Sequence, residues 1–227
     1  MMKKLFTFLF ISFSAFQFSH AQLSAFMGYG TFDNPEGSPY LETYLKVLGG
    51  SSKLAELPTG KLQSKIEVQW IFKSGEKIVH FEKYNLLSPE IDPNDSVIPD
   101  FINQQRINLP NGIYTVELTL KDFNSVNKEN VVSQEIKIDY SKDKVMVSDI
   151  VLLESFSPTV TTNLYSKNGY DLIPLAGNFY PSSINKLRFY AEIYNTLSTN
   201  NDPFIVRYYV TNSNNDRILD DLFLLKK

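Results

Sequence analysis

Histidine and cysteine are common catalytic bases and nucleophiles, and this chain has very few of them. It contains two histidines and no cysteine in 227 residues. His20 lies in a leader that we expect to be removed, so a serine–histidine–acid triad would have to use His80. Residues 78–82 around it read as the middle of a strand, without the sharp turn that presents a serine nucleophile. We therefore expect His80 to be structural, and we predict no catalytic residue and no cofactor.

Calcium ligands are the second possibility, in the run of Asp, Pro, Asn, Asp and Ser at residues 92–96. An EF-hand loop needs glycine at its sixth position and glutamate at its twelfth, where this chain has Val97 and Asn103. An irregular site is the alternative, using Asp92, Asn94 and Asp95. Asp, Pro and Asn also form turns without any metal, and thiolate zinc sites are excluded without cysteine. We predict no metal site.

A five-residue pattern, which we call the echo, occurs twice in the chain, and each copy contains one glutamate. Tyr40-Leu41-Glu42-Thr43-Tyr44 recurs as Tyr190-Ala191-Glu192-Ile193-Tyr194. Glycosidases use two carboxylates at a fixed separation, so Glu42 and Glu192 are candidates for one such pair. Because they belong to two copies of one pattern, we favour the same local role in each copy over one shared site.

Alternation places the tyrosines and the glutamate of each copy on one strand face, opposite mostly apolar positions. We expect this to be a solvated face, where aromatic and charged neighbours stabilise strand pairing by about 0.2–1 kcal/mol each. The functional alternative is a tyrosine-rich surface for contact with a glycan or a protein. Its candidate binding residues are Tyr40, Glu42, Tyr44, Tyr190, Glu192 and Tyr194.

The elements that must position these residues are strands. From Leu62 to Phe72, alternate positions are nearly all apolar, while Gln, Lys and Glu mark the other face. The pattern breaks at Ser74-Gly75 and resumes over residues 76–87, which predicts a hairpin with glycine in its turn. A second pair covers residues 114–121 and 132–140. Polar outer faces of this kind are typical of antiparallel sheets in a sandwich.

A long connection with three prolines is expected between the two hairpins, over residues 88–110. It leads into Leu109-Pro110-Asn111-Gly112-Ile113-Tyr114. This Leu-x-x-Gly-x-Tyr ending resembles the tyrosine corner of immunoglobulin-like sandwiches, in which the tyrosine hydroxyl bonds back to the preceding loop. Tyr114 is therefore the predicted corner residue.

The echo also predicts the fold class and the domains. Each copy is followed by another alternating strand, at residues 65–72 and 204–211, as two tandem units would be. The boundary is expected in the short charged stretch at residues 141–144. We predict an all-β fold of tandem immunoglobulin-like or fibronectin-like antiparallel sandwiches, with domains at residues 22–142 and 143–227.

The second predicted unit is expected to be incomplete. About 70 residues of the first unit follow its turn at Ser74-Gly75, whereas about a dozen follow the corresponding turn at residues 212–215. Half a sandwich leaves an apolar face uncovered and a strand edge unpaired. We interpret the chain as a truncated reading frame or a fragment in preference to a protein whose missing strands come from a partner.

The N-terminus predicts export. Two lysines, an apolar run at residues 5–16 and the small-residue exit Ser19-His20-Ala21 follow the order of a cleavable signal peptide at residues 1–21. The run has about 12 residues where a spanning helix needs about 20, and no later apolar stretch is long enough. No cysteine is present to carry a lipid anchor. We predict a periplasmic or extracellular protein with no transmembrane span after removal of the signal.

Charge and cysteine content limit the partners. Removal of Lys3 and Lys4 takes the 22 basic residues to 20, against 25 acidic ones. A mildly acidic chain with scattered charges lacks a footprint for nucleic acid. Without disulfides, an exported chain must hold its fold by core burial.

Three segments share a pattern with a known family. They are Ser38-Pro39-Tyr40-Leu41-Glu42-Thr43-Tyr44, the stretch from Phe101 through Gln105-Arg106 to Asp122, and Phe189-Tyr190-Ala191-Glu192-Ile193-Tyr194-Asn195. They resemble the N-terminal half of GWxTD-domain proteins, which are exported bacterial envelope proteins. The resemblance implies tandem sandwich-like domains ahead of a C-terminal region with the Gly-Trp-x-Thr-Asp motif. That region is absent here, since the only tryptophan is Trp70, between Gln69 and Ile71. The resemblance brings no catalytic residues.

These features predict a non-catalytic envelope protein that acts as a protein-interaction or spacer module, with another envelope protein or a glycan as partner. A carbohydrate-binding module is the alternative, and an enzyme fragment whose active part is missing is the third class. A flat row of exposed aromatic residues would favour the glycan. An unpaired apolar edge would favour a protein partner, and a deep cleft with converging carboxylates would favour the enzyme.

Overall fold

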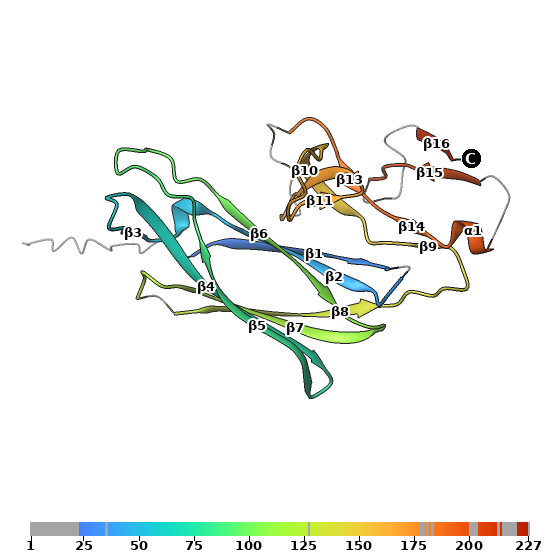
Figure 1. Ribbon diagram of the computed structural model, residues 1–227, viewed down its shortest axis with the longest axis horizontal. Helices are drawn as coiled ribbons and strands as arrows, with labels where there is room; N and C mark the ends of the chain where they lie inside the picture. The colour runs from blue at the N-terminus through green and yellow to red at the C-terminus, as the bar shows by residue number, and fades with distance from the viewer. Residues whose placement is uncertain are drawn as a thin grey trace, which may run out of the picture.

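The computed structural model describes residues 23–34, 36–126, 128–177, 180, 182, 184–199, 204–212, 214 and 222–226. Nearly all of its regular structure is β-strand, and the named strand pairs are antiparallel (Figure 1). The predicted all-β class is therefore confirmed. The signal peptide predicted at residues 1–21 lies outside the described residues. Within them, no helix has the length and apolar character needed to cross a membrane.

Two sheets pack face to face in the first part of the chain. One has the order β1-β2-β6; the other has the order β3-β4-β7-β8, with β5 also paired to β4. The bounds are β1 (Ala25–Phe32), β2 (Tyr40–Val47), η1 (Gly49–Ser51), β3 (Leu54–Glu56), β4 (Leu62–Ser74), β5 (Lys77–Leu87), β6 (Phe101–Asn108), β7 (Gly112–Asp122) and β8 (Asn130–Ile138).

Both predicted hairpins are confirmed. Strand β4 pairs with β5 around Gly75, whose φ of 58° suits glycine, and β7 pairs with β8. Strand β4 forms the centre of the sandwich core, because its alternate residues Ile66, Val68, Trp70 and Phe72 are completely buried. Each buried aliphatic or phenyl side chain stabilises the fold by about 1.5–3 kcal/mol relative to exposure.

Tyr114 forms the hydrogen bond expected of the tyrosine corner. Its hydroxyl donates to the carbonyl oxygen of Pro110 at 2.8 Å. Next to it, the Asn111 side chain donates to the Tyr140 carbonyl at 2.6 Å and accepts from the Tyr140 N–H at 2.9 Å. These bonds close the end of the sandwich where β7 begins and β8 finishes.

The long connection predicted at residues 88–110 is wrong in part, because it contains strand β6. This strand pairs with β2 along its whole length, from Tyr40 opposite Asn108 to Val47 opposite Phe101. Gln104 and Arg106 lie on the β6 face that points away from the sandwich core, beside Tyr44 and Glu42 of β2. A strand with polar residues on this face lacks the apolar alternation by which the other strands were recognised.

The second part of the chain is made of shorter strands. Strands β11-β12-β10-β13 form one sheet, and β14-β9 and β15-β16 form two pairs. The bounds are β9 (Met146–Val147), β10 (Val151–Pro158), β11 (Ser166–Lys167), β12 (Tyr170–Pro174), β13 (Phe189–Tyr190), β14 (Ile193–Tyr194), α1 (Thr196–Thr199), β15 (Phe204–Tyr208) and β16 (Leu222–Lys226). The tandem repeat and its boundary at residues 141–144 stay predictions.

The alternating strand expected over the second copy of the echo, residues 190–194, is interrupted. Strand β13 pairs with β10, whereas β14 pairs with β9. Between them the N–H of Glu192 donates to the side-chain oxygen of Ser148 at 2.8 Å. A serine hydroxyl thus takes the place of a main-chain partner, and the ladder breaks at this point.

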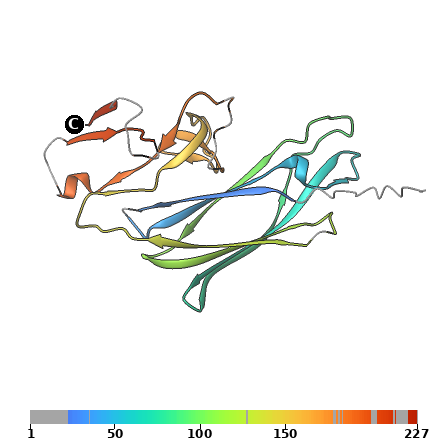
Figure 2. The same ribbon diagram turned by 180° about the vertical axis from the view of Figure 1, so that it is seen from behind.

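The β1-β2-β6 sheet is covered on both faces. Its inner face meets the β4-β7-β8 sheet, and its outer face meets the second part of the chain (Figures 1 and 2). The outer contact has its own apolar core, made by Phe32, Tyr44, Val151, Leu153 and Ala176. The solvated face predicted for Tyr40, Glu42 and Tyr44 is therefore wrong, since Glu42 and Tyr44 are buried.

Candidate functional site

Lys167 lies at the centre of the contact between the two parts. It ends β11, and the two-residue turn Asn168-Gly169 leads into β12, with Lys167 opposite Tyr170. Both turn residues have positive φ, 49° for Asn168 and 83° for Gly169, which is the conformation that Asn-Gly favours in tight hairpins. The hairpin holds Lys167 against the outer face of β2.

The two echo glutamates meet at this lysine. The Nζ atom of Lys167 is 3.1 Å from Oε1 of Glu42 and 3.3 Å from Oε1 of Glu192. The side chains of Lys167, Glu42 and Glu192 are only 9%, 4% and 15% exposed. The interpretation that the two glutamates do not share a site is therefore wrong. We call Lys167, Glu42, Glu192 and Arg106 the clamp.

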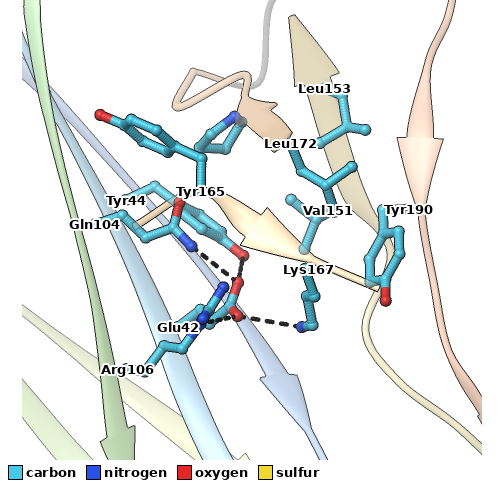
Figure 3. A pocket seen from close by; sticks show the side chains of 11 residues that line it. Glu42, Tyr44, Gln104, Arg106, Val151, Leu153, Tyr165, Lys167, Leu172 and Tyr190 are labelled. Atoms are coloured by element: carbon cyan, nitrogen blue, oxygen red, sulfur yellow. Dashed lines mark hydrogen bonds and ion pairs between the residues drawn. The ribbon is translucent and has the colours of Figure 1, made fainter. Parts of the chain in front are cut away.

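Glu42 is held from β2 and β6 (Figure 3). Its Oε1 accepts from Nε of Arg106 at 2.8 Å, and its Oε2 accepts from the Tyr44 hydroxyl at 2.7 Å. The Gln104 amide adds a longer bond to Oε2 at 3.4 Å. Every one of these donors lies on the outer face, so β-pairing brings them to Glu42 directly.

Glu192 repeats this arrangement in the second copy. The hydroxyl of Tyr194, two residues later, donates to Oε2 at 2.6 Å, as Tyr44 does to Glu42. The Tyr190 hydroxyl donates to Oε1 at 2.6 Å, and the Asn168 amide lies 3.5 Å from the same atom. The sequence echo thus gives the same local role in both copies, in addition to the shared lysine.

Aromatic rings enclose the ammonium group. Its Nζ lies 3.0 Å from the centroid of the Phe32 ring, and 5.1 and 5.2 Å from the rings of Tyr40 and Tyr190. Tyr40 stacks on Phe32 with centroids 5.4 Å apart. A cation over desolvated rings gains about 2 kcal/mol or more, which helps to offset its removal from water.

The clamp is balanced in charge, with two carboxylates and two cations. Burial lowers the pKa of Lys167, while the charges of Glu42 and Glu192 oppose this effect. Burial also raises the pKa values of Tyr40, Tyr44, Tyr190 and Tyr194 above 10, and the neighbouring glutamates raise them further. The hydroxyls therefore stay protonated, and those of Tyr44, Tyr190 and Tyr194 donate to the carboxylates.

The clamp has a closed side and an open side. On the Glu42 side the cavity measures about 10 Å³, roughly the space of one water. On the Glu192 side an open pocket of about 370 Å³ is lined by Asn168, Tyr190, Glu192 and Tyr194, among others. The cavity beside Glu42 has room for about one water, whereas water and small solutes reach Glu192 through the open pocket.

The other candidate residues lie away from the clamp. His80 is on β5, packs edge-on against Phe72 at 5.4 Å and has Glu82 at 3.8 Å from Nε2. Asp95 accepts a bond from the Asp92 N–H at 2.9 Å, which is turn chemistry. The described residues contain no group of three or more His, Asp or Glu side chains placed to hold a metal ion.

Sequence reasoning missed two members of the clamp. Arg106 was hidden in a segment interpreted as a connection. Lys167 was signalled by the Asn168-Gly169 pair that follows it, a strong hairpin signal. The pair would have located the hairpin, although no local pattern shows that the hairpin packs on β2.

Comparison with known proteins leaves the clamp to be interpreted from its own geometry. No protein-family model, curated protein or solved structure matches this chain. The resemblance to GWxTD-domain proteins therefore stays a hypothesis. The fold defines the class of the molecule, an antiparallel all-β protein whose β1-β2-β6 sheet has both faces covered.

We expect stability to fall as the pH rises above about 10. The four tyrosines around the clamp, Tyr40, Tyr44, Tyr190 and Tyr194, lose their protons near pH 10 in the unfolded chain but only at higher pH in the folded one, so alkali favours unfolding. Lys167 acts in the opposite direction just below its ordinary value of 10.5, because its folded pKa is lowered, but it is one group against four. The ultraviolet absorbance of tyrosinate, followed with circular dichroism, measures both events.

The tyrosinate absorbance and the circular dichroism signal should change together for the tyrosines buried between the two parts of the chain. Part of the absorbance change is expected to occur only as the circular dichroism signal is lost. Tyr194→Phe removes one such late-titrating group and serves as the matched variant. Complete ionisation of all tyrosines while the fold persists would contradict the buried hydroxyl assignment.

Proposed function

We propose that this chain is a non-catalytic exported envelope protein that acts as a spacer or protein-interaction module. One observation carries the proposal: the residues that looked available for binding are turned inward and hold the second part of the chain against the first. A spacer must keep a fixed direction between its parts, and a buried, charge-balanced network with defined partners favours one arrangement.

Close packing of β1 against the second part of the chain supports the same interpretation. A Cβ atom at Gly30 of β1 would lie 2.8 Å from the side chain of Val151, so the two parts meet without room for a side chain there. At Gly28 an added Cβ would be 3.5 Å from the Ala176 carbonyl, an ordinary contact. An interface this close behaves as a packed core and resists sliding.

An edge strand supports a protein partner more than a glycan. Strand β5 pairs with β4 alone among the described strands and carries exposed Ile78, Val79, Phe81 and Leu87. By contrast, Tyr44 and Tyr194 are buried and their hydroxyls are engaged, so they form no flat aromatic row. An unpaired strand edge with apolar side chains is a surface on which a strand of another chain can pair.

Gly30→Val tests the spacer directly. The larger side chain is expected to push β10 from β1 and cost about 1–3 kcal/mol, while the core around Trp70 stays folded. Small-angle X-ray scattering should show one rigid shape for the native chain and a broader distribution for the variant. Gly28→Ala is the control and should scatter like the native chain. Equal flexibility in all three would count against a fixed joint.

Export is tested separately, by cell fractionation and by sequencing the N-terminus of the product. We expect a chain that begins after Ala21 and is found outside the cytoplasm. A product that keeps residues 1–21 in the cytoplasm would remove the envelope part of the proposal. The spacer part would then be judged by the scattering experiment alone.

Glycan binding is a second candidate, favoured by the open pocket of about 370 Å³ beside Glu192. Its lining joins tyrosine, an amide and a carboxylate, a combination that suits sugar hydroxyls. Affinity electrophoresis in cell-surface polysaccharides tests it. Retardation that Tyr190→Ala removes would favour this candidate over the spacer.

A further inference from the structure

We propose that Lys167 forms an intramolecular isopeptide bond with Glu192, and that Glu42 carries the proton that must leave the lysine. This cross-link would replace one ion pair of the clamp by an amide. It goes beyond the spacer role and does not depend on it.

The geometry provides a nucleophile next to two carboxyl groups. The lysine nitrogen is 3.3 Å from Glu192 and 3.1 Å from Glu42, and the side chain has only 9% exposure. Well-oriented groups held together in a fold react as if at very high concentration. The aromatic enclosure by Phe32, Tyr40 and Tyr190 keeps bulk water from the nitrogen. Burial also lowers the pKa of Lys167, which favours the neutral amine that attacks.

Charge balance selects Glu192 as the carboxyl that reacts. An amide between Lys167 and Glu192 removes one positive and one negative charge, and it leaves Glu42 paired with Arg106 at 2.8 Å. An amide between Lys167 and Glu42 would instead leave Arg106 without its carboxylate partner and Glu192 without a cation. The Arg106 side chain is partly exposed, but that of Glu192 is only 15% exposed, and a carboxylate left there without a cation is unfavourable, so the first product is preferred.

The surroundings of Glu192 suit the reaction. Tyr190 and Tyr194 donate to its two oxygens at 2.6 Å each, which polarises the carboxyl and stabilises the oxygen of a tetrahedral intermediate. The pocket of about 370 Å³ beside Glu192 gives the released water an exit, whereas the cavity beside Glu42 measures only about 10 Å³.

The step balances without any co-reactant. The lysine nitrogen forms a bond to Cδ of Glu192, and one Cδ–O bond breaks. Two of the three ammonium protons leave with that oxygen as water, one of them transferred through Glu42, and the third stays on the amide nitrogen. Glu42 ends as it began, as a carboxylate.

The mass of the purified full-length product tests the proposal. We expect the native chain to weigh about 18 Da less than its sequence, the mass of one water. Trypsin should then leave residues 145–186 uncut at Lys167 and joined to residues 189–207, which contain Glu192. Any cyclised N-terminal glutamine occurs in every variant and cancels in the comparison.

Three variants complete the test, each measured on folded monomer. Lys167→Arg keeps the charge but should lose the mass deficit, and Glu42→Gln should lose it because the proton carrier is gone. Lys142→Arg is the control, since among the described residues Lys142 pairs with one buried carboxylate, that of Asp33, at 2.9 Å. It should retain the mass deficit.

The tryptic peptide map of the native chain shows whether the bond between Lys167 and Glu192 has formed, even if a variant fails to fold. A native mass equal to that of the sequence, or a branch to the peptide that contains Glu42, would overturn the proposal.

Discussion

Lys167→Met should cost about 3–5 kcal/mol of unfolding free energy, because it removes the partner that Glu192 has in the native chain, whether an ammonium group or the proposed amide, and leaves a largely buried carboxylate behind. Methionine keeps most of the aliphatic length, so the loss reports charge rather than volume. Glu42 would keep its ion pair with Arg106. Among the described residues, Lys167 is the cationic partner of Glu192, so Glu192 would lose its ion pair. Urea unfolding of the full chain, followed by circular dichroism, measures the change.

Lys83→Met is the matched control for this substitution. Lys83 also pairs with a glutamate, Glu67, at 3.0 Å, but both side chains are substantially exposed. Surface pairs of this kind contribute about 0–1 kcal/mol. In the double variant Lys167→Met with Glu192→Gln, stability should partly recover, because the unpaired charge is gone. No recovery would mean that the unpaired carboxylate is not the cause of the loss.

The hairpins of the first part could be predicted because one face of β4 and one face of β7 meet a uniform apolar core. Strand β4 alternates between buried residues such as Trp70 and polar ones such as Gln69. The corner at Tyr114 was also predictable, since its partner Pro110 is only four residues away. Local periodicity and short-range hydrogen bonds are sufficient for such features.

The clamp could not be predicted, because its burial depends on residues more than 100 positions apart. Glu42 and Lys167 are separated by 125 residues, and only their contact makes the outer face of β2 an interior. A face with Tyr, Glu and Tyr reads as solvated unless its partner is known. The echo in the sequence was the correct signal, but it suggested two separate roles where the fold makes one site.

Gly49→Ala is expected to cost about 3 kcal/mol, the upper end of the cost of overpacking a core. A Cβ atom there would lie 2.2 Å from the carbonyl oxygen of Pro99 and 2.8 Å from that of Ile98, so main chain would have to move. The Gly49 N–H also donates to Asp100 at 3.1 Å. These residues lead directly into β6, the strand that carries Arg106.

Gly50→Ala is the neighbouring control and should be neutral or stabilising by about 0.4–1 kcal/mol, because nothing lies within 4 Å of its Cβ position. Hydrogen exchange at β6 adds a second readout, since a shift of residues 98–100 should weaken protection there before the β4–β7 pair is affected. Equal effects of the two alanines would mean that chain entropy, not the contact with Pro99, decides the outcome. A loss confined to Gly49→Ala, with faster exchange in β6, would show that this glycine controls how β6 presents Arg106 to Glu42.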